Sequence, residues 1–78
     1  MKHFKVLGSG CRNCETTANL IKNAAEQAGV EIELEKVTDI AEIMTYGVMS
    51  TPCVVLDGKV VHAGGVPDQV FVRQWISE

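Results

Sequence analysis

The hydrophobic and polar residues of this chain follow the periods of strands and helices in turn. A short segment, His3–Leu7, places residues on two faces with a period of two and predicts a strand. In the next segment, Glu15–Ala28, small and apolar residues recur at helical spacing, which predicts an amphipathic helix. Its expected buried stripe consists of Cys14, Ala18, Ile21, Ala25 and Ala28. Gly29 is expected to end this helix, because glycine readily adopts the conformation of a C-terminal cap.

The middle of the chain predicts a second strand and a short second helix. Apolar residues alternate with three glutamates over Val30–Glu35, which is typical of a strand with one face in water. We expect this row of glutamates, Glu31, Glu33 and Glu35, to be solvated. Thr38 or Asp39 can then cap a short helix. The buried stripe expected for it consists of Ile40, Ile43 and Met44.

The last third of the chain predicts a hairpin followed by a helix. Two apolar segments, Cys53–Leu56 and Lys59–Ala63, flank the dipeptide Asp57-Gly58, a strong signal for a two-residue β-turn. Pro67 and Asp68 are expected to open the final helix. Its expected core residues are Val72, Trp75 and Ile76.

The order of these elements, β-α-β-α-β-β-α, predicts a single α/β domain over residues 1–78. A strand–helix–strand connection favours a parallel pair with a right-handed crossover, whereas the hairpin is antiparallel. We therefore expect a mixed four-stranded sheet with helices on both faces. In open α/β sheets functional sites gather at the carboxyl ends of parallel strands, which is where Cys11 follows the first strand.

Composition excludes several classes of function. The net charge is −3 and basic residues form no cluster, so nucleic-acid binding is not expected. No apolar segment is long enough to span a membrane, and the N-terminus leads into a strand rather than a signal sequence. We therefore expect a cytoplasmic protein. An odd number of cysteines, three, argues against a secreted disulfide framework.

Cys11 and Cys14 are the candidate reactive residues. They are separated by two residues at the start of the first helix, where unpaired backbone N–H groups and the helix dipole stabilise a thiolate. A thiolate attacks disulfides, and a second nearby thiol can resolve the mixed disulfide. The same spacing also fits a binding site for a soft metal or metalloid. Its ligands would be Cys11 and Cys14, either alone or together with Cys53.

Four segments together resemble the thioredoxin-like superfamily, and most closely its small, glutaredoxin-sized redox-active disulfide proteins. They are Gly10–Cys14, Gly47–Pro52, Asp57–Lys59 and Gly64–Pro67. The resemblance covers nearly the whole chain and implies the thioredoxin-like fold. It also implies a thiol–disulfide oxidoreductase that needs no bound cofactor, acts as a monomer, and exchanges with a protein disulfide and with a dithiol reductase that donates electrons.

The resemblance also implies a role for each matching residue. Cys11 would be the attacking thiol and Cys14 the resolving thiol. Pro52 would follow a cis peptide bond, so that the Thr51 backbone can pair with a partner. Arg12 and Gly65 would complete the partner-binding surface, and Arg12 would favour the Cys11 thiolate.

Three features depart from the thioredoxin pattern. Gly10 stands where thioredoxin has Trp before the first cysteine, and Arg12 and Asn13 stand where it has Gly-Pro between the two cysteines. Lys5 occupies the position at which thioredoxin carries a buried carboxylate, and the first strand contains no acid. The route by which Cys14 loses its proton therefore stays open. Cys53 directly follows Pro52, and three roles remain for it: a buried hydrophobic residue, a second resolving thiol, or a third metal ligand.

Overall fold

The computed structural model describes residues 1–8, 12–48 and 50–78. Within these ranges the elements follow the expected order. They are β1 (Lys2–Leu7), α1 (Arg12–Ala28), β2 (Ile32–Val37), α2 (Ile40–Met44), β3 (Cys53–Leu56), β4 (Lys59–Ala63) and α3 (Gln69–Ser77). None of the helices in the described ranges is long and apolar enough to cross a membrane.

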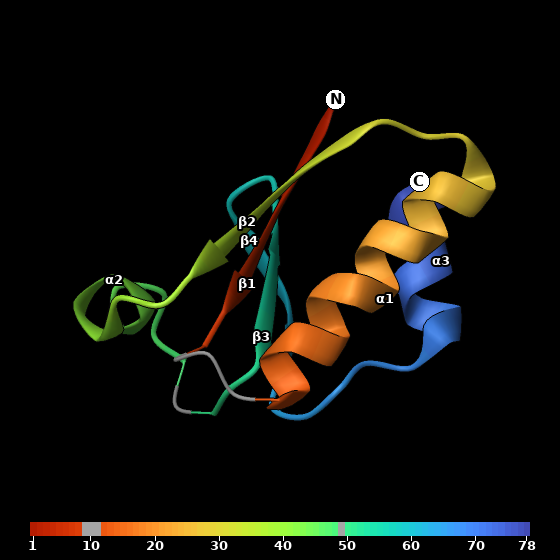
Figure 1. Ribbon diagram of the computed structural model, residues 1–78. Helices are drawn as coiled ribbons and strands as arrows, with labels where there is room; N and C mark the ends of the chain where they lie inside the picture. The colour runs from red at the N-terminus through yellow and green to blue at the C-terminus, as the bar shows by residue number, and fades with distance from the viewer. Residues whose placement is uncertain (9–11, 49) are drawn as a thin grey trace.

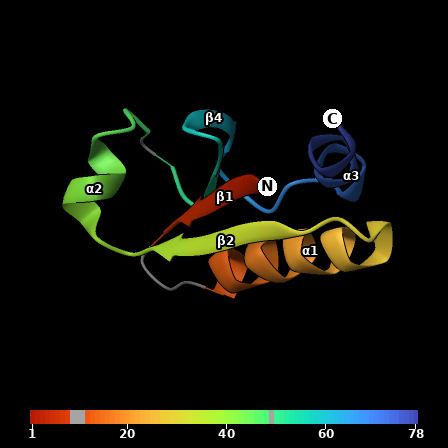
Figure 2. The same ribbon diagram turned by 90° about the horizontal axis from the view of Figure 1, so that it is seen from above.

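The strands form a four-stranded mixed sheet in the order β2-β1-β3-β4. β1 pairs with β2 in parallel and with β3 in antiparallel orientation, and β4 pairs with β3 in antiparallel orientation. Figure 1 shows α1 and α3 together on one side of the sheet and α2 on the other. Figure 2 shows α1 lying along β2. The predicted mixed sheet with helices on both faces is confirmed.

Each face of the sheet covers its own hydrophobic cluster, because successive strand residues point to opposite sides. Phe4 and Val6 of β1 pack with residues of α1 and α3, whereas Leu7 packs on the α2 side. The same alternation divides β3. The α1/α3 cluster contains Phe4, Val6, Cys14, Ala18, Ile21, Ala25, Val54, Val72, Trp75 and Ile76. The α2 cluster contains Leu7, Val37, Ile43, Cys53 and Val55.

The first helix includes Cys14 in its first turn, as predicted, but its buried stripe differs from the prediction. Thr17 is fully buried, and its hydroxyl donates a 2.7 Å hydrogen bond to the Asn13 carbonyl, which satisfies the polar group inside the core. Ala28, in contrast, is exposed at the last residue of the helix. The prediction that Ala28 is buried was therefore wrong.

Gly29 ends α1 and thereby shifts the start of β2. Its φ of +66° and two hydrogen bonds form a Schellman cap: Gly29 N–H donates to Glu26 and Val30 N–H donates to Ala25. Because the cap holds Val30, the strand covers Ile32–Val37 instead of the predicted Val30–Glu35.

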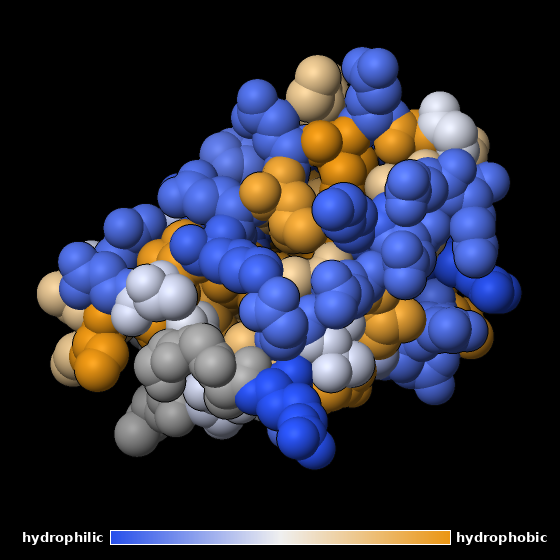
Figure 3. All heavy atoms as spheres, in the orientation of Figure 1, coloured by the Kyte–Doolittle hydropathy of each residue, from blue (hydrophilic) through white to orange (hydrophobic). Residues whose placement is uncertain are grey.

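The buried stripe predicted for α2 is wrong at two of its three residues. Ile43 is buried, but Ile40 and Met44 are 64% and 68% exposed. A helix of only five residues at the end of the molecule turns a single residue toward the sheet. Figure 3 shows hydrophobic residues on the surface at this end. Asp39 is the N-cap, since its carboxylate accepts from Ala41 N–H at 3.0 Å.

The hairpin and the last helix match their predictions. β3 and β4 have the expected bounds, and the turn between them has positive φ at Asp57 (50°) and Gly58 (84°), as a type I′ turn requires. Asp68 caps α3 by accepting from Val70 N–H at 2.9 Å. The expected core residues Val72, Trp75 and Ile76 are all buried.

Candidate active site

Cys14 lies near the start of α1, the helix that follows the carboxyl end of β1. It belongs to the first turn of α1, is 6% exposed, and is disulfide-bonded. Because α1 is 17 residues long and Cys14 is in its first turn, this cysteine lies at the positive end of the helix dipole. Cys11, the predicted attacking residue, lies outside the described residues together with Ser9 and Gly10.

Gly8, for which the sequence indicated only a turn after the first strand, lies against Cys14. It is buried directly after β1, and its N–H donates a 2.9 Å hydrogen bond to the Val37 carbonyl of β2. A methyl group on its Cα would overlap the Cys14 Sγ and would lie 3.8 Å from the Thr51 Cβ. The structure therefore brings together Gly8, Cys14 and Thr51, of which the sequence predicted only the last two.

The Thr51–Pro52 segment has the geometry that the resemblance implied. Its peptide bond is cis, Thr51 is exposed and Pro52 is buried. The Pro52 carbonyl accepts a 2.9 Å hydrogen bond from Gly64 N–H. This bond places the turn after β4, including the exposed Gly65 with φ of +77°, beside the cis-proline.

His62 links this turn to the core, which the sequence did not indicate. Its Nε2 lies 3.0 Å from the Gly65 carbonyl oxygen, so the imidazole donates from that nitrogen. The ring centroid lies 6.2 Å from that of Trp75 in α3, with the two planes tilted by 53°. His62 therefore connects a predicted partner-binding residue to the buried tryptophan.

Arg12 is the first residue of α1 and is exposed. Its backbone carbonyl accepts a 3.0 Å hydrogen bond from the Thr16 hydroxyl, one turn further along. The guanidinium adds a full positive charge to the partial positive charge of the helix N-terminus. Both charges favour a nearby thiolate over the neutral thiol.

Cys53 lies on the other face of the sheet from Cys14. It is fully buried as a free thiol in the α2 cluster, and its sulfur donates to the Ser50 carbonyl. Burial raises the pKa of the Cys53 thiol, against a smaller opposing effect of a hydrogen bond from Gly64. Of the three roles left open by the sequence, these observations favour the buried hydrophobic residue.

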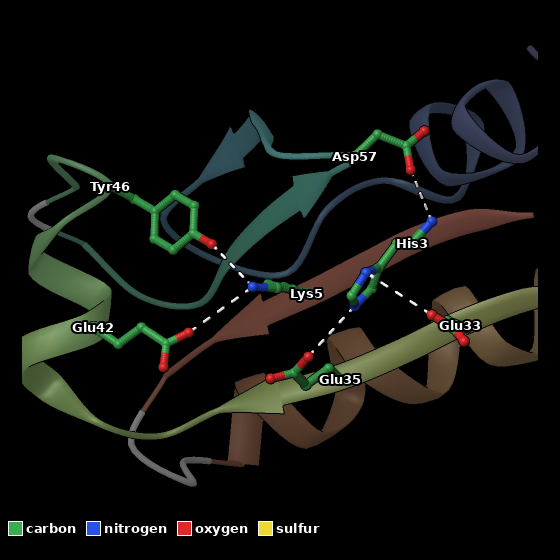
Figure 4. A network of polar contacts seen from close by, with 7 residues as sticks. All are labelled: His3, Lys5, Glu33, Glu35, Glu42, Tyr46 and Asp57. Carbon is green, nitrogen blue, oxygen red and sulfur yellow. Dashed lines mark hydrogen bonds and ion pairs between the residues drawn. The ribbon is translucent and has the colours of Figure 1, made fainter.

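Lys5 also points away from Cys14, toward the α2 side. Its Nζ donates a 3.2 Å hydrogen bond to the Tyr46 hydroxyl and lies 3.9 Å from a Glu42 carboxylate oxygen, as Figure 4 shows. The hydrogen bond to Tyr46 raises the pKa of Lys5, with further contributions from the charges of Tyr46, Glu35 and Glu42. The strand position at which thioredoxin carries its acid therefore faces Tyr46 in this protein.

The predicted row of glutamates is exposed on β2 and the residue before it. Two of them approach the His3 imidazole: Glu33 at 3.9 Å and Glu35 at 3.4 Å (Figure 4). Exposed pairs of this kind contribute little to stability. They form a surface feature separate from the cysteines.

A metal site finds no support in the residues that the structure describes. Among residues 1–8, 12–48 and 50–78, no three His, Cys, Asp or Glu side chains are close enough to hold a metal ion. The ligand set considered from the sequence includes Cys11, which is outside these ranges, so that alternative stays untested.

The sequence of this chain is similar to those of proteins named thioredoxin. A family model described as a thioredoxin domain matches residues 2–77. Over 71 residues the chain is 38% identical to a thioredoxin of Methanocaldococcus jannaschii, which covers 91% of this chain and 81% of that protein. It is 25% identical over 77 residues to a thioredoxin of Methanothermobacter thermautotrophicus, covering 99% and 100% of the two chains.

A solved structure shares the fold at lower similarity. It is a Nu-class GST from Haemonchus contortus, with a TM-score of 0.50 and 21% sequence identity. The match covers 99% of this chain but only 35% of the larger protein, and it carries information about the fold alone.

Proposed function

Because this chain belongs to the thioredoxin domain family, we propose that it is a thiol–disulfide oxidoreductase that exchanges a Cys11–Cys14 dithiol with disulfides of partner proteins. The observation that carries the proposal is the state of Cys14: disulfide-bonded, nearly excluded from water, and in the first turn of a long helix. A reducing compartment, as in the cytoplasm, would return this disulfide to the dithiol.

The first step is attack by Cys11 on a disulfide of the partner. The thiolate is the attacking species, and the N-terminus of α1 with the Arg12 guanidinium stabilises it. A bond forms between the Cys11 sulfur and one partner sulfur, while the partner's own S–S bond breaks. The second partner sulfur leaves as a thiolate, and the two proteins are joined by a mixed disulfide.

In the second step Cys14 resolves the mixed disulfide. Its sulfur attacks that of Cys11, the bond to the partner breaks, and the remaining partner sulfur departs. The thiol proton of Cys14 passes to a departing partner thiolate, which is a base of similar strength. This transfer needs no carboxylate, in keeping with the position of Lys5 on the far side of the sheet. In total two electrons pass to the partner, and an external dithiol reductase restores the starting state.

The partner would dock over Thr51 and Gly65. Both are exposed, and the hydrogen bond between Gly64 and Pro52 holds their segments next to each other. Thr51 also lies beside Gly8 and Cys14. An extended partner chain that pairs with the Thr51 backbone would thus bring its disulfide to the start of α1.

Variants of the two cysteines test the proposal. Cys11→Ser should abolish reduction of a disulfide-bonded model protein such as insulin, whereas Cys14→Ser should accumulate a mixed disulfide through Cys11. Cys53→Ser is the matched control and should do neither, because Cys53 is buried on the other face. Adducts are read by non-reducing electrophoresis and mass spectrometry.

Three other outcomes would contradict the proposal. Adducts that form with Cys11→Ser but not with Cys14→Ser would reverse the two roles. A wild-type dithiol that never exchanges with disulfides would reject the oxidoreductase. If that inert protein also kept a stoichiometric metal through purification, the metal-binding alternative would replace it.

A further inference from the structure

Gly8 is the residue whose missing side chain makes room for the sulfur of Cys14. We propose that Gly8 is a positioning residue that sets the balance between the disulfide and dithiol forms of the site, acting through Cys14. The inference rests on the proposed function, since it assumes that Cys14 alternates between the two forms.

The contact at Gly8 is unusually close. A Cβ at this position would overlap the Cys14 Sγ and lie 3.2 Å from the Cys14 Cβ. The Thr51 Cβ closes the same space from another side, at 3.8 Å. No other residue type fits here without a shift of its surroundings.

The backbone of Gly8 is not free to retreat from Cys14. Its N–H is bonded to the Val37 carbonyl at 2.9 Å, and Leu7 before it pairs with β2 on one side and β3 on the other. The φ angle of Gly8 is outside the left-handed region, in contrast to those of the five other glycines that the structure describes. Alanine at this position therefore meets a steric obstacle rather than a strained backbone.

The obstacle differs between the two redox forms. In the disulfide, the Cys14 sulfur is held by its covalent bond and cannot turn away from a methyl group. In the dithiol, rotation about χ1 can carry the sulfur to another staggered position. A methyl group at Gly8 therefore destabilises the disulfide more than the dithiol, because an overfilled core relaxes only where its atoms can move.

The equilibrium with glutathione measures this difference. One protein dithiol and one glutathione disulfide give one protein disulfide and two glutathione thiols, with two electrons transferred. Gly8→Ala should shift this equilibrium at least tenfold toward the dithiol, which makes the potential about 30 mV more oxidising. Each cysteine is alkylated at every point of the titration and its state is read by mass spectrometry.

Ala25→Gly is the matched control. Ala25 is buried in the same cluster further along α1, and glycine inside a helix lowers stability without touching Cys14. This variant should unfold more easily and keep the wild-type potential. A shift of its potential equal to that of Gly8→Ala would overturn the inference, because loss of stability would then explain both.

A second variant keeps the inference testable if Gly8→Ala does not fold. Removing the sulfur that the methyl group meets, in Gly8→Ala with Cys14→Ala, should restore folding, with a free energy of unfolding close to that of Cys14→Ala alone. If the double variant also fails to fold, the contact with the Cys14 sulfur is not the cause and the inference is wrong.

The titration separates this inference from the proposed function. If the wild-type protein shows no reversible Cys11–Cys14 pair, the oxidoreductase itself is rejected. If the wild-type pair titrates and Gly8→Ala has the same or a more reducing potential, only the role of Gly8 is rejected.

Discussion

Cys14 and Cys53 belong to the same small sheet domain but face opposite sides of it. Cys14 packs in the cluster under α1 and α3, and Cys53 packs with Leu7, Val37 and Ile43 under α2. The sheet itself separates the two sulfurs. The two cysteines therefore belong to different hydrophobic clusters, and only Cys14 lies at the start of α1.

Cys53 should accordingly stay out of redox exchange. Cys53→Ala should leave the glutathione titration of the other two cysteines unchanged and lower the free energy of unfolding by about 1 kcal/mol, because a buried atom is lost. In the folded wild-type protein, Cys53 should be alkylated at least about tenfold more slowly than after denaturation. A Cys53-containing disulfide at any point of the titration would contradict this prediction.

The raised pKa of Cys53 predicts a loss of stability at alkaline pH. Burial holds the folded-state pKa above the ordinary value of 9.0, so between the two values the unfolded chain releases a proton that the folded protein keeps. The unfolded state is thereby favoured, and the free energy of unfolding should fall as pH rises through about 9. Denaturant titrations of the oxidised protein between pH 7 and pH 10 measure the effect, which Cys53→Ala should remove.

An acid placed at Lys5 should not recreate the acid of thioredoxin. Lys5 is the direct neighbour of Glu35 in the sheet and an ion-pair partner of Glu42, on the side away from Cys14. Lys5→Asp should therefore lower the free energy of unfolding through repulsion between like charges, while the rate at which Cys14 resolves a mixed disulfide stays unchanged. Lys5→Met, which keeps the apolar stem without charge, is the control. Faster resolution in Lys5→Asp alone would contradict this orientation.

Arg12 should matter for the reactivity of Cys11 rather than for folding. It is exposed at the first residue of α1, where it adds charge to the helix N-terminus. Arg12→Gln should slow alkylation of Cys11 near pH 7 by about two- to fivefold, the effect of losing one partly screened charge. Arg73→Gln, a substitution of another exposed arginine on α3, should leave the rate unchanged. Equal rates in wild type and Arg12→Gln would show that the helix alone activates the thiol.

The elements that local sequence signals define were predictable. The turn at Asp57 and Gly58 determines where both hairpin strands stop, and the predicted bounds of those strands are confirmed. The start of β2 was not predictable from alternation alone, because the cap at Gly29 uses Val30 for its hydrogen bond to Ala25. That bond belongs to the end of the helix rather than to the strand.

The parts of the site that depend on contacts between residues far apart in the chain could not be predicted from the sequence. Gly8 reads as an ordinary turn glycine until Val37 and Thr51 lie beside it. His62 reads as a surface strand residue until Trp75 packs near its ring. Met44 is exposed because only one residue of α2, Ile43, packs against the sheet. The helical spacing of apolar residues does not indicate how much of a helix is covered.

His62 contacts both Gly65 and Trp75, so the fluorescence of the tryptophan can report on the turn that contains Gly65. The chain has a single tryptophan, and its ring lies near the imidazole of His62, which is hydrogen-bonded to Gly65 in the turn beside the cis-proline. A partner that pulls on this turn would change the distance between the two rings and hence the quenching of indole emission. Docking could then be followed by intrinsic fluorescence, in real time and without an attached dye.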